Sequence, residues 1–234
     1  GYIRGIGSKS KGSAVGFYVD GVPHFESSAF NIDLSDIAAV DVFRGPQGTL
    51  YGRNSIAGII NVYTHNPLDY QKTRIKVGYG RFNDFVAQAS NYSKVSDQFG
   101  ISTAISYHHN DGMFTNHFLN EKADKLNEGE GRIGLYWRPN TNWLIHLNST
   151  LTLSKQNGYP YAPYDIEKKE LSPISYNRNS PYKRLISSTG FNVRYENGHI
   201  SFNSQTSYQF IKSHQGLDQD FTPKDIFFTD NSYH

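Results

Sequence analysis

Strict alternation of apolar and polar residues recurs along the chain after Pro67 and limits the folds that it can adopt. Successive side chains of a β-strand point to opposite faces, so a period of two predicts strands with one apolar and one polar face. The clearest case is residues 99–108, where Ile101 and Ile105 alternate with small or polar residues. About seven such strands are expected, near residues 73–80, 85–89, 99–108, 132–138, 143–153, 190–195 and 200–210.

The same alternation would suit a half-buried sheet of a soluble protein, but the composition of the two faces favours a membrane-spanning barrel. The polar faces carry mainly Gly, Ser, Asn, Gln and Thr, whereas a solvent-exposed face would carry more Lys and Glu. Aromatic residues gather at the strand ends, where a barrel has its interfacial belts. They are Phe99, Trp137, Trp143, Tyr195 and Phe202 near one end, and Tyr79, Tyr107, Tyr208 and Phe210 near the other.

The connections between the expected strands alternate in length. Short turns are expected at residues 95–98, 139–142 and 196–199, and long polar stretches lie between them at 110–130 and 155–184. Outer-membrane barrels have short turns on one side and long loops on the other, and compact soluble domains rarely contain structureless loops of this length. The sequence therefore predicts a mainly β fold: a partial transmembrane antiparallel β-barrel whose curved sheet is not closed.

Composition narrows the class of protein further. The net charge is only +2, which argues against a nucleic-acid partner because such proteins carry a strong excess of Lys and Arg. Aromatic residues make up 15% of the chain although the mean hydropathy is −0.60, as expected for a wall that is apolar on one face only. The chain has no cysteine, which excludes disulfides, thiolate metal sites and a cysteine nucleophile.

The segment before Pro67 has a different character, that of a small α+β unit. Strands are predicted at residues 14–22, 39–44 and 58–64, the first ending at an Asp20-Gly21 turn. A short helix is predicted at residues 33–39.

Residues 44–60 read RGPQGTLYGRNSIAGII, with VDGV at 19–22 and IRG at 3–5 before them and NVYTHNP at 61–67 after them. This ordered set resembles the plug domain of TonB-dependent outer-membrane receptors. The resemblance implies that residues 1–67 form the C-terminal part of a plug and residues 68–234 the N-terminal strands of an outer-membrane β-barrel. We interpret both ends of the chain as cuts, so the rest of a barrel of about 22 strands would lie outside it.

The resemblance implies active uptake of a ferric siderophore or a similar scarce ligand across the bacterial outer membrane. Its implied partners are the TonB complex, through a segment before Gly1, the ligand and the outer-membrane lipid; no cofactor and no enzymatic activity are implied. The alternatives are import of a carbohydrate or a cobalamin-like ligand, a soluble β-rich binding module, and a barrel enzyme. RGPQGTLYGRN is more similar to the siderophore branch than to the glycan-importing branch.

The candidate site residues lie in the first part of the chain. The resemblance places Arg4 and Arg44 where related receptors carry arginines that lock the plug to barrel glutamates. Distance from the motif places the plug apices at residues 7–11 and 23–27, and the candidate ligand contacts there are Ser8, Lys9, His24, Phe25 and Glu26. The pairs His108-His109 and Asp218-x-Asp220 lack a recurring ligand spacing, so no metal site is predicted.

Overall fold

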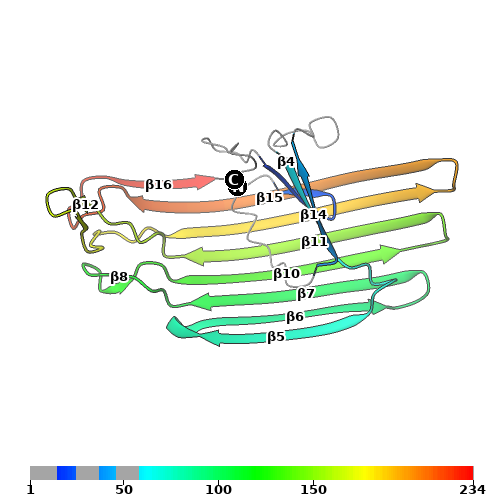
Figure 1. Cartoon of the computed structure of the whole chain (residues 1–234), viewed down its shortest axis with the longest axis horizontal. Helices are drawn as coiled ribbons and strands as arrows, with labels where there is room; N and C mark the ends of the chain where they lie inside the picture. The colour runs from blue at the N-terminus through cyan, green and yellow to red at the C-terminus, as the bar shows by residue number, and fades with distance from the viewer. Residues whose placement is uncertain (1–14, 25–36, 46–57, 234) are drawn as a thin grey trace.

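The computed structural model describes residues 15–24, 37–45 and 58–233, which form two β-sheets (Figure 1). Most of the helix expected at residues 33–39 lies outside these ranges. Within them, no helix is long and apolar enough to cross a membrane.

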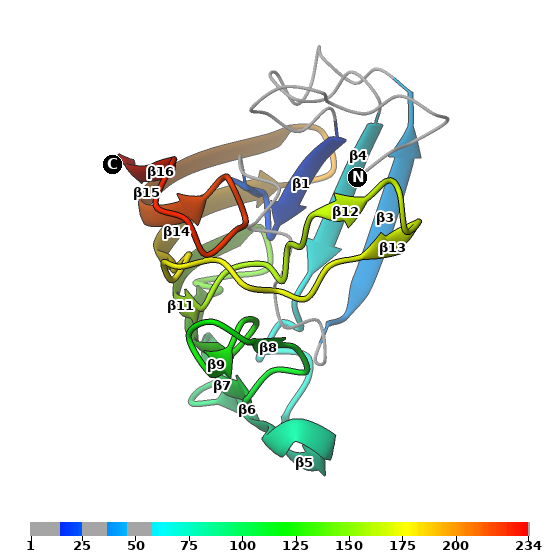
Figure 2. The same cartoon turned by 90° about the vertical axis from the view of Figure 1, so that its left-hand side faces the viewer.

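The larger sheet is an eight-stranded antiparallel meander, which confirms the predicted mainly β, unclosed antiparallel fold. Its strands, in spatial order, are β5 (Lys72–Gly80), β6 (Asp84–Lys94), β7 (Phe99–Asn110), β10 (Leu126–Trp137), β11 (Trp143–Gln156), β14 (Tyr182–Glu196), β15 (Ser201–Asp218) and β16 (Phe228–Tyr233). The sheet curves into a trough whose edges are β5 and β16 (Figure 2). The strand β16 is additional to those expected, because its sequence FTDNSY has no clear apolar alternation.

The connections follow the predicted asymmetry. The short turns at residues 95–98, 139–142 and 196–199 lie at one end of the strands, on the right in Figure 1. At the other end, the 3-10 turn η2 (Arg81–Asn83) joins β5 to β6, and the long loops contain two small hairpins. The hairpins are β8 (Thr115–Asn116) with β9 (Glu121–Lys122), and β12 (Tyr164–Asp165) with β13 (Glu170–Leu171).

The convex face of this sheet is apolar and exposed. Register aligns Ile101, Leu135, Leu147 and Phe191 across four neighbouring strands. Other large apolar side chains on this face are exposed by 40–74%: Ile75, Val77, Tyr79, Ile105, Ile133, Leu151, Leu153, Phe202, Tyr208 and Phe210. An exposed apolar surface of this extent marks contact with lipid or a partner, and its alternation with a polar face is that of a membrane barrel wall.

The smaller sheet lies on the concave side and has the strand order β2-β1-β4-β3 (Figure 2). Its strands are β1 (Val15–Val19), β2 (Val22–His24), β3 (Ala39–Arg44) and β4 (Gly58–Tyr63). β1, β3 and β4 lie within the three strands predicted before Pro67, and β2 is an additional strand that follows the Asp20-Gly21 turn. The strands β1 and β4 are parallel, and the other two pairings are antiparallel. Phe17, Val19 and Val62 form its buried core.

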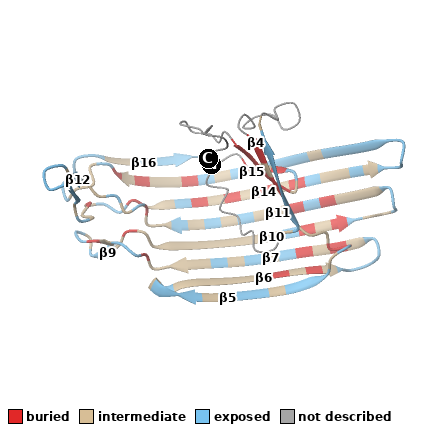
Figure 3. Ribbon diagram, in the orientation of Figure 1, coloured by how far each residue is buried: buried red, intermediate tan, exposed pale blue. Residues whose placement is uncertain are grey.

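The small sheet contacts the concave face of the large one near the short turns. Asp20 accepts hydrogen bonds from the backbone N–H and the hydroxyl of Thr64, at 2.8 and 2.7 Å, and the Thr64 hydroxyl lies 3.3 Å from the Tyr136 hydroxyl on β10. On β14, Gly190 allows the Val22 side chain to approach the wall closely. Buried residues of the wall gather beneath the crossing strands, as Figure 3 shows.

A charged side chain on the convex face should impair insertion. We expect Ile105→Arg to destabilise the folded protein by about 2–4 kcal/mol, because the guanidinium would enter hydrocarbon. The matched control is Ser106→Arg, since Ser106 points to the concave face between Gln88 and Glu130. Folding into lipid vesicles, followed by heat-dependent gel mobility, measures the effect; equal loss in both variants would contradict the assignment of the faces.

Gly190→Ala tests the contact between the sheets. An added methyl group at this position would overlap the side chains of Val22 and Asn148. We expect a loss of about 1–3 kcal/mol of unfolding free energy, seen as a lower thermal midpoint. Gly131→Ala is the control because nothing lies within 4 Å of the added methyl group there; a midpoint unchanged in both variants would refute close packing at Gly190.

Candidate functional site

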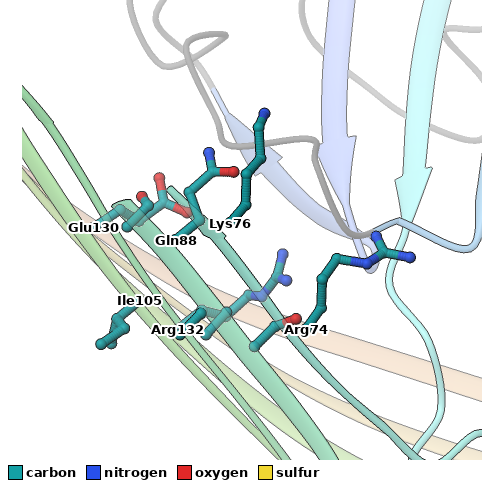
Figure 4. A pocket seen from close by; sticks show the side chains of 10 residues that line it. Arg74, Lys76, Gln88, Ile105, Glu130 and Arg132 are labelled. Carbon is teal, nitrogen blue, oxygen red and sulfur yellow. The ribbon is translucent and has the colours of Figure 1, made fainter. Parts of the chain in front are cut away.

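A cluster of charged side chains, here called the lumen cluster, lies on the concave face of β5, β6, β7 and β10. Arg74, Lys76 and Arg132 supply three cationic groups and Glu130 one carboxylate, and all four line one small pocket. Their side chains point from the wall toward the small sheet, whereas Ile105 points away (Figure 4). Among these four side chains, the cationic groups outnumber the carboxylate.

Hydrogen bonds hold parts of the lumen cluster in place. The Thr152 hydroxyl donates to Glu130 Oε2 at 3.3 Å, and Arg132 Nη2 donates to the Tyr92 hydroxyl at 3.5 Å. Nearer the long loops, Arg184 Nη2 lies 3.7 Å from Glu128 Oε2, with these side chains only 7% and 13% exposed. Charges fixed on an enclosed surface act through a lower effective dielectric than exposed ones, so this wall can attract an anion from the loop end.

The long loops contact one another at the loop end of the wall. Asn116 is buried and its Nδ2 donates to the Tyr176 carbonyl at 2.9 Å, while the His117 N–H donates to the Ile174 carbonyl at 2.8 Å. The β12–β13 hairpin reaches from the wall across the concave side (Figure 2). The rings of Tyr161 and Phe221 lie 5.2 Å apart, joining two separate loops. These contacts give the loop end an ordered aromatic and polar surface.

A second hollow of about 680 Å³ separates the small sheet from the wall near the short turns. Its lining combines apolar surface with polar side chains, among them Asp20 and Asn61 from the small sheet and His146, Asn192 and Gln205 from the wall. Polar groups on both sides provide partners for water in this space. Over the residues that the structure describes, the contacts between the two sheets are local and this hollow lies beside them.

The segment between the sheets is fixed to the wall by an ion pair. Arg138 Nη1 and Nη2 donate to Asp69 Oδ1 and Oδ2 at 3.0 and 2.8 Å, a bidentate arrangement. The hydrogen bond from Arg138 lowers the pKa of Asp69 below its usual value. Beside it, the ring of His65 stacks on Tyr70 with centroids 3.8 Å apart. Because the pair is partly exposed, we assign it a role in positioning rather than a large stabilising energy.

His24 and Arg44 are the two predicted site residues that the structure describes. His24 ends β2, is 8% exposed and packs edge-on against Phe17 at 5.8 Å. Burial lowers its pKa to about 4, so the ring is neutral at physiological pH. Arg44 is the exposed last residue of β3. The other candidates, Ser8, Lys9, Phe25, Glu26 and Arg4, lie outside the described residues.

The residues that might have suggested a metal site have other contacts. His108 Nε2 lies 2.7 Å from Asp84 Oδ1, and His109 contacts Asn127 and Asp111. In the loop after β15, hydrogen bonds from the Thr222 hydroxyl and from backbone N–H groups lower the pKa of Asp220. Over residues 15–24, 37–45 and 58–233, no group of three His, Asp or Glu side chains is placed to hold a metal ion.

The lumen cluster was not anticipated from sequence. The available signal was the placement of Arg74 and Lys76, and of Glu130 and Arg132, at alternate positions on otherwise small or neutral polar faces. Charges at polar-face positions of a barrel strand point into the lumen. Their meeting depends on strand register, which the sequence pattern alone does not give.

Known proteins resemble this chain in its first part. The TonB-dependent Receptor Plug Domain family matches residues 2–59. The Pesticin receptor of Yersinia enterocolitica is 43% identical over 67 residues, which are 28% of this chain and 10% of that protein. The Vitamin B12 transporter BtuB of Vibrio vulnificus is 37% identical over 84 residues, 34% of this chain and 13% of that protein. The matches thus span only about a tenth of these relatives.

Solved structures share the fold over most of the chain. The ferric yersiniabactin uptake receptor FyuA from Yersinia pestis aligns with a TM-score of 0.77 at 23% identity, covering 91% of this chain and 34% of that one. The pyoverdine outer membrane receptor FpvA from Pseudomonas aeruginosa aligns with a TM-score of 0.73 at 15% identity, covering 96% of this chain and 34% of that one.

The plug signature and the barrel strands occur in one chain, in the same order as in these receptors. The apolar convex face and the polar concave face, which carries the small sheet, are those of a barrel wall around a plug. Residues 2–59 therefore match the TonB-dependent Receptor Plug Domain family, and the described strands share the fold of the matched part of these solved receptors.

Proposed function

We propose that the receptor containing this chain imports a ferric siderophore, an anionic iron chelate. The observation that carries the proposal is the lumen cluster, where three cationic side chains and one carboxylate face the plug side of the wall. A lumen surface of net positive charge raises the local concentration of an anion and lowers the barrier to its passage. The structural neighbours named as a ferric yersiniabactin uptake receptor and as a pyoverdine receptor support the same class of ligand.

Energy for this import would come from the TonB complex, which we propose as the partner of the receptor. The limited contact between the sheets supports such a mechanism. Among the described residues, Asp20, Thr64, Val22 and Gly190 make local contacts, and a hollow of about 680 Å³ lies beside them. An interface of this kind separates at lower cost than a continuous apolar core, so a pulled plug can move while the wall stays folded.

The predicted contacts in the first part of the chain remain part of the proposal. Lys9 would attract the anionic chelate and Phe25 would stack on a ring of the ligand, with Ser8, His24 and Glu26 beside them. Because the His24 ring is buried and neutral, its part would be to support the adjacent apex rather than to add charge. Arg4 and Arg44 would pair with barrel carboxylates to hold the plug.

A cobalamin-like ligand is the second candidate. The match to the vitamin B12 transporter extends over 84 residues, farther than the 67 residues matched by the pesticin receptor. Such a ligand depends less on a cationic lumen than a ferric chelate does, so charge-removing variants distinguish the two candidates.

Uptake in a strain that lacks the gene, with and without the full-length receptor, tests the ligand class. We expect complementation to restore TonB-dependent uptake of radiolabelled iron from at least one ferric siderophore and to leave cobalamin uptake unchanged. Restoration of cobalamin uptake alone would overturn the siderophore proposal and favour the second candidate.

Removing charge from the lumen cluster tests its role. We expect Arg74→Gln combined with Arg132→Gln to lower the initial rate of iron uptake about tenfold at an unchanged receptor level, because two charge-assisted contacts are lost. The control is Arg81→Gln with Lys94→Gln, which removes two charges outside the cluster, one stacked over Phe82 and one paired with Asp97. Equal rates in the wild type and both variants would show that the cluster does not act on the ligand.

A further inference from the structure

A row of basic side chains crosses the convex, membrane-facing side of the sheet at its long-loop end. Register places Lys155 of β11 directly opposite Lys183 of β14, and Lys183 opposite His214 of β15. Lys212 lies on the same face, opposite Leu185. We call these four residues the basic row. Like charges directly opposite on neighbouring strands are destabilising, so their occurrence here calls for a compensating anion.

The described part of the chain supplies little of that compensation. None of its carboxylates lies within 4.0 Å of the ammonium groups of Lys155, Lys183 or Lys212, and all three side chains are exposed. Only His214 has an acidic neighbour, with its Nδ1 3.2 Å from Asp230 Oδ1 and 3.2 Å from the Ser232 hydroxyl. The three lysines therefore remain available to a bound anion.

An apolar groove of about 570 Å³ lies beside the basic row. Its lining joins Lys155, Lys183, Lys212 and His214 to the apolar side chains Tyr107, Leu153 and Leu185. The groove has no side chain at Gly129 of β10, where an added methyl group would meet only a backbone oxygen, at 3.9 Å; at Gly131, the next residue on this face, it would meet nothing within 4 Å. The groove is thus apolar toward the middle of the strands and cationic toward the loops.

This order of groups matches an amphiphile with an anionic head. The long loops of an outer-membrane barrel face the outside of the cell, so the basic row lies at the level of the outer-leaflet headgroups. Lysines at a membrane boundary extend their ammonium groups to the headgroup region, and basic clusters there bind phosphorylated lipids.

We propose that the basic row and the groove form a binding site for a phosphorylated glycolipid of the outer leaflet, of the lipid A class. Its phosphates bind the ammonium groups of Lys155, Lys183 and Lys212, and an acyl chain lies over Gly129 and Gly131, between Tyr107 and Leu153. The site faces away from the lumen, so it is separate from the ligand path proposed above and does not depend on the imported ligand.

Native mass spectrometry of the full-length receptor in detergent, titrated with bis-phosphorylated lipid A, tests the site. We expect Lys155→Gln, Lys183→Gln and Lys212→Gln together to weaken binding at least about tenfold. The control with the same change in charge is Lys168→Gln, Lys169→Gln and Lys224→Gln, at exposed lysines of the long loops. Gly129→Leu fills the groove without a change of charge and should also weaken binding.

Three further probes identify the source of the anion. Dephosphorylated lipid A and phosphatidylglycerol should bind about tenfold more weakly than bis-phosphorylated lipid A, and equimolar inorganic phosphate should not displace it. Equal binding of phosphatidylglycerol, displacement by phosphate, or equal lipid A affinity in the wild type and the triple variant of the basic row would each overturn the proposal. Iron uptake measured in parallel separates this outcome from a failure of the siderophore proposal.

Discussion

Backbone hydrogen bonding in hydrocarbon is the constraint on which the rest of this structure depends. A membrane interior offers no water, so each N–H and C=O group of a spanning strand must pair with a neighbouring strand. In the described wall, the strands from β6 to β15 meet this demand, because each is paired on both sides in a continuous antiparallel meander. Once the strands are paired in this way, one face of the sheet contacts lipid and the other faces the lumen. Because successive residues point to opposite faces, apolar and polar residues alternate along each strand.

The concave face contacts the small sheet, whereas the convex face is exposed. Under the proposed function, the concave face holds a plug that has to release the lumen during transport. Over the described residues the contacts are local: Thr64 joins Asp20 to Tyr136, Val22 packs against Gly190, and a hollow lies between. The lumen cluster occupies the same face, where charges are shielded from lipid and exposed to a passing solute.

The alternation of apolar and polar residues predicted most strands of the wall, because this alternation can be read from local sequence. The strands at residues 99–108 and 143–153 were expected from alternation, and their short turns from polar residues between them. The strand β16 was missed because FTDNSY has no apolar alternation, and its pairing with β15 depends on tertiary contacts. Within the large sheet, residues of distant sequence meet only through register, as Arg74 and Arg132 do in the lumen cluster and Lys155 and Lys183 in the basic row.

The candidate site was less predictable than the fold. Motif spacing placed His24 at an apex, but its burial depends on the packing of Phe17 across the small sheet. The plug boundary at residue 67 and the roles of Arg4 and Arg44 remain predictions. The ordered loop contacts, such as Asn116 with the Tyr176 carbonyl, join residues far apart in sequence and carry no periodic signal.

The most direct test of the account is a scan of solvent access along β7. The chain has no cysteine, so single cysteines at residues 100–107 can carry a spin label in the full-length receptor, in a background free of other cysteines. We expect labels at 101, 103, 105 and 107 to be accessible to lipid-soluble oxygen, and labels at 100, 102, 104 and 106 to be shielded from it. An absence of this period of two, or its reversal, would contradict a wall with lipid on one side and a plug on the other.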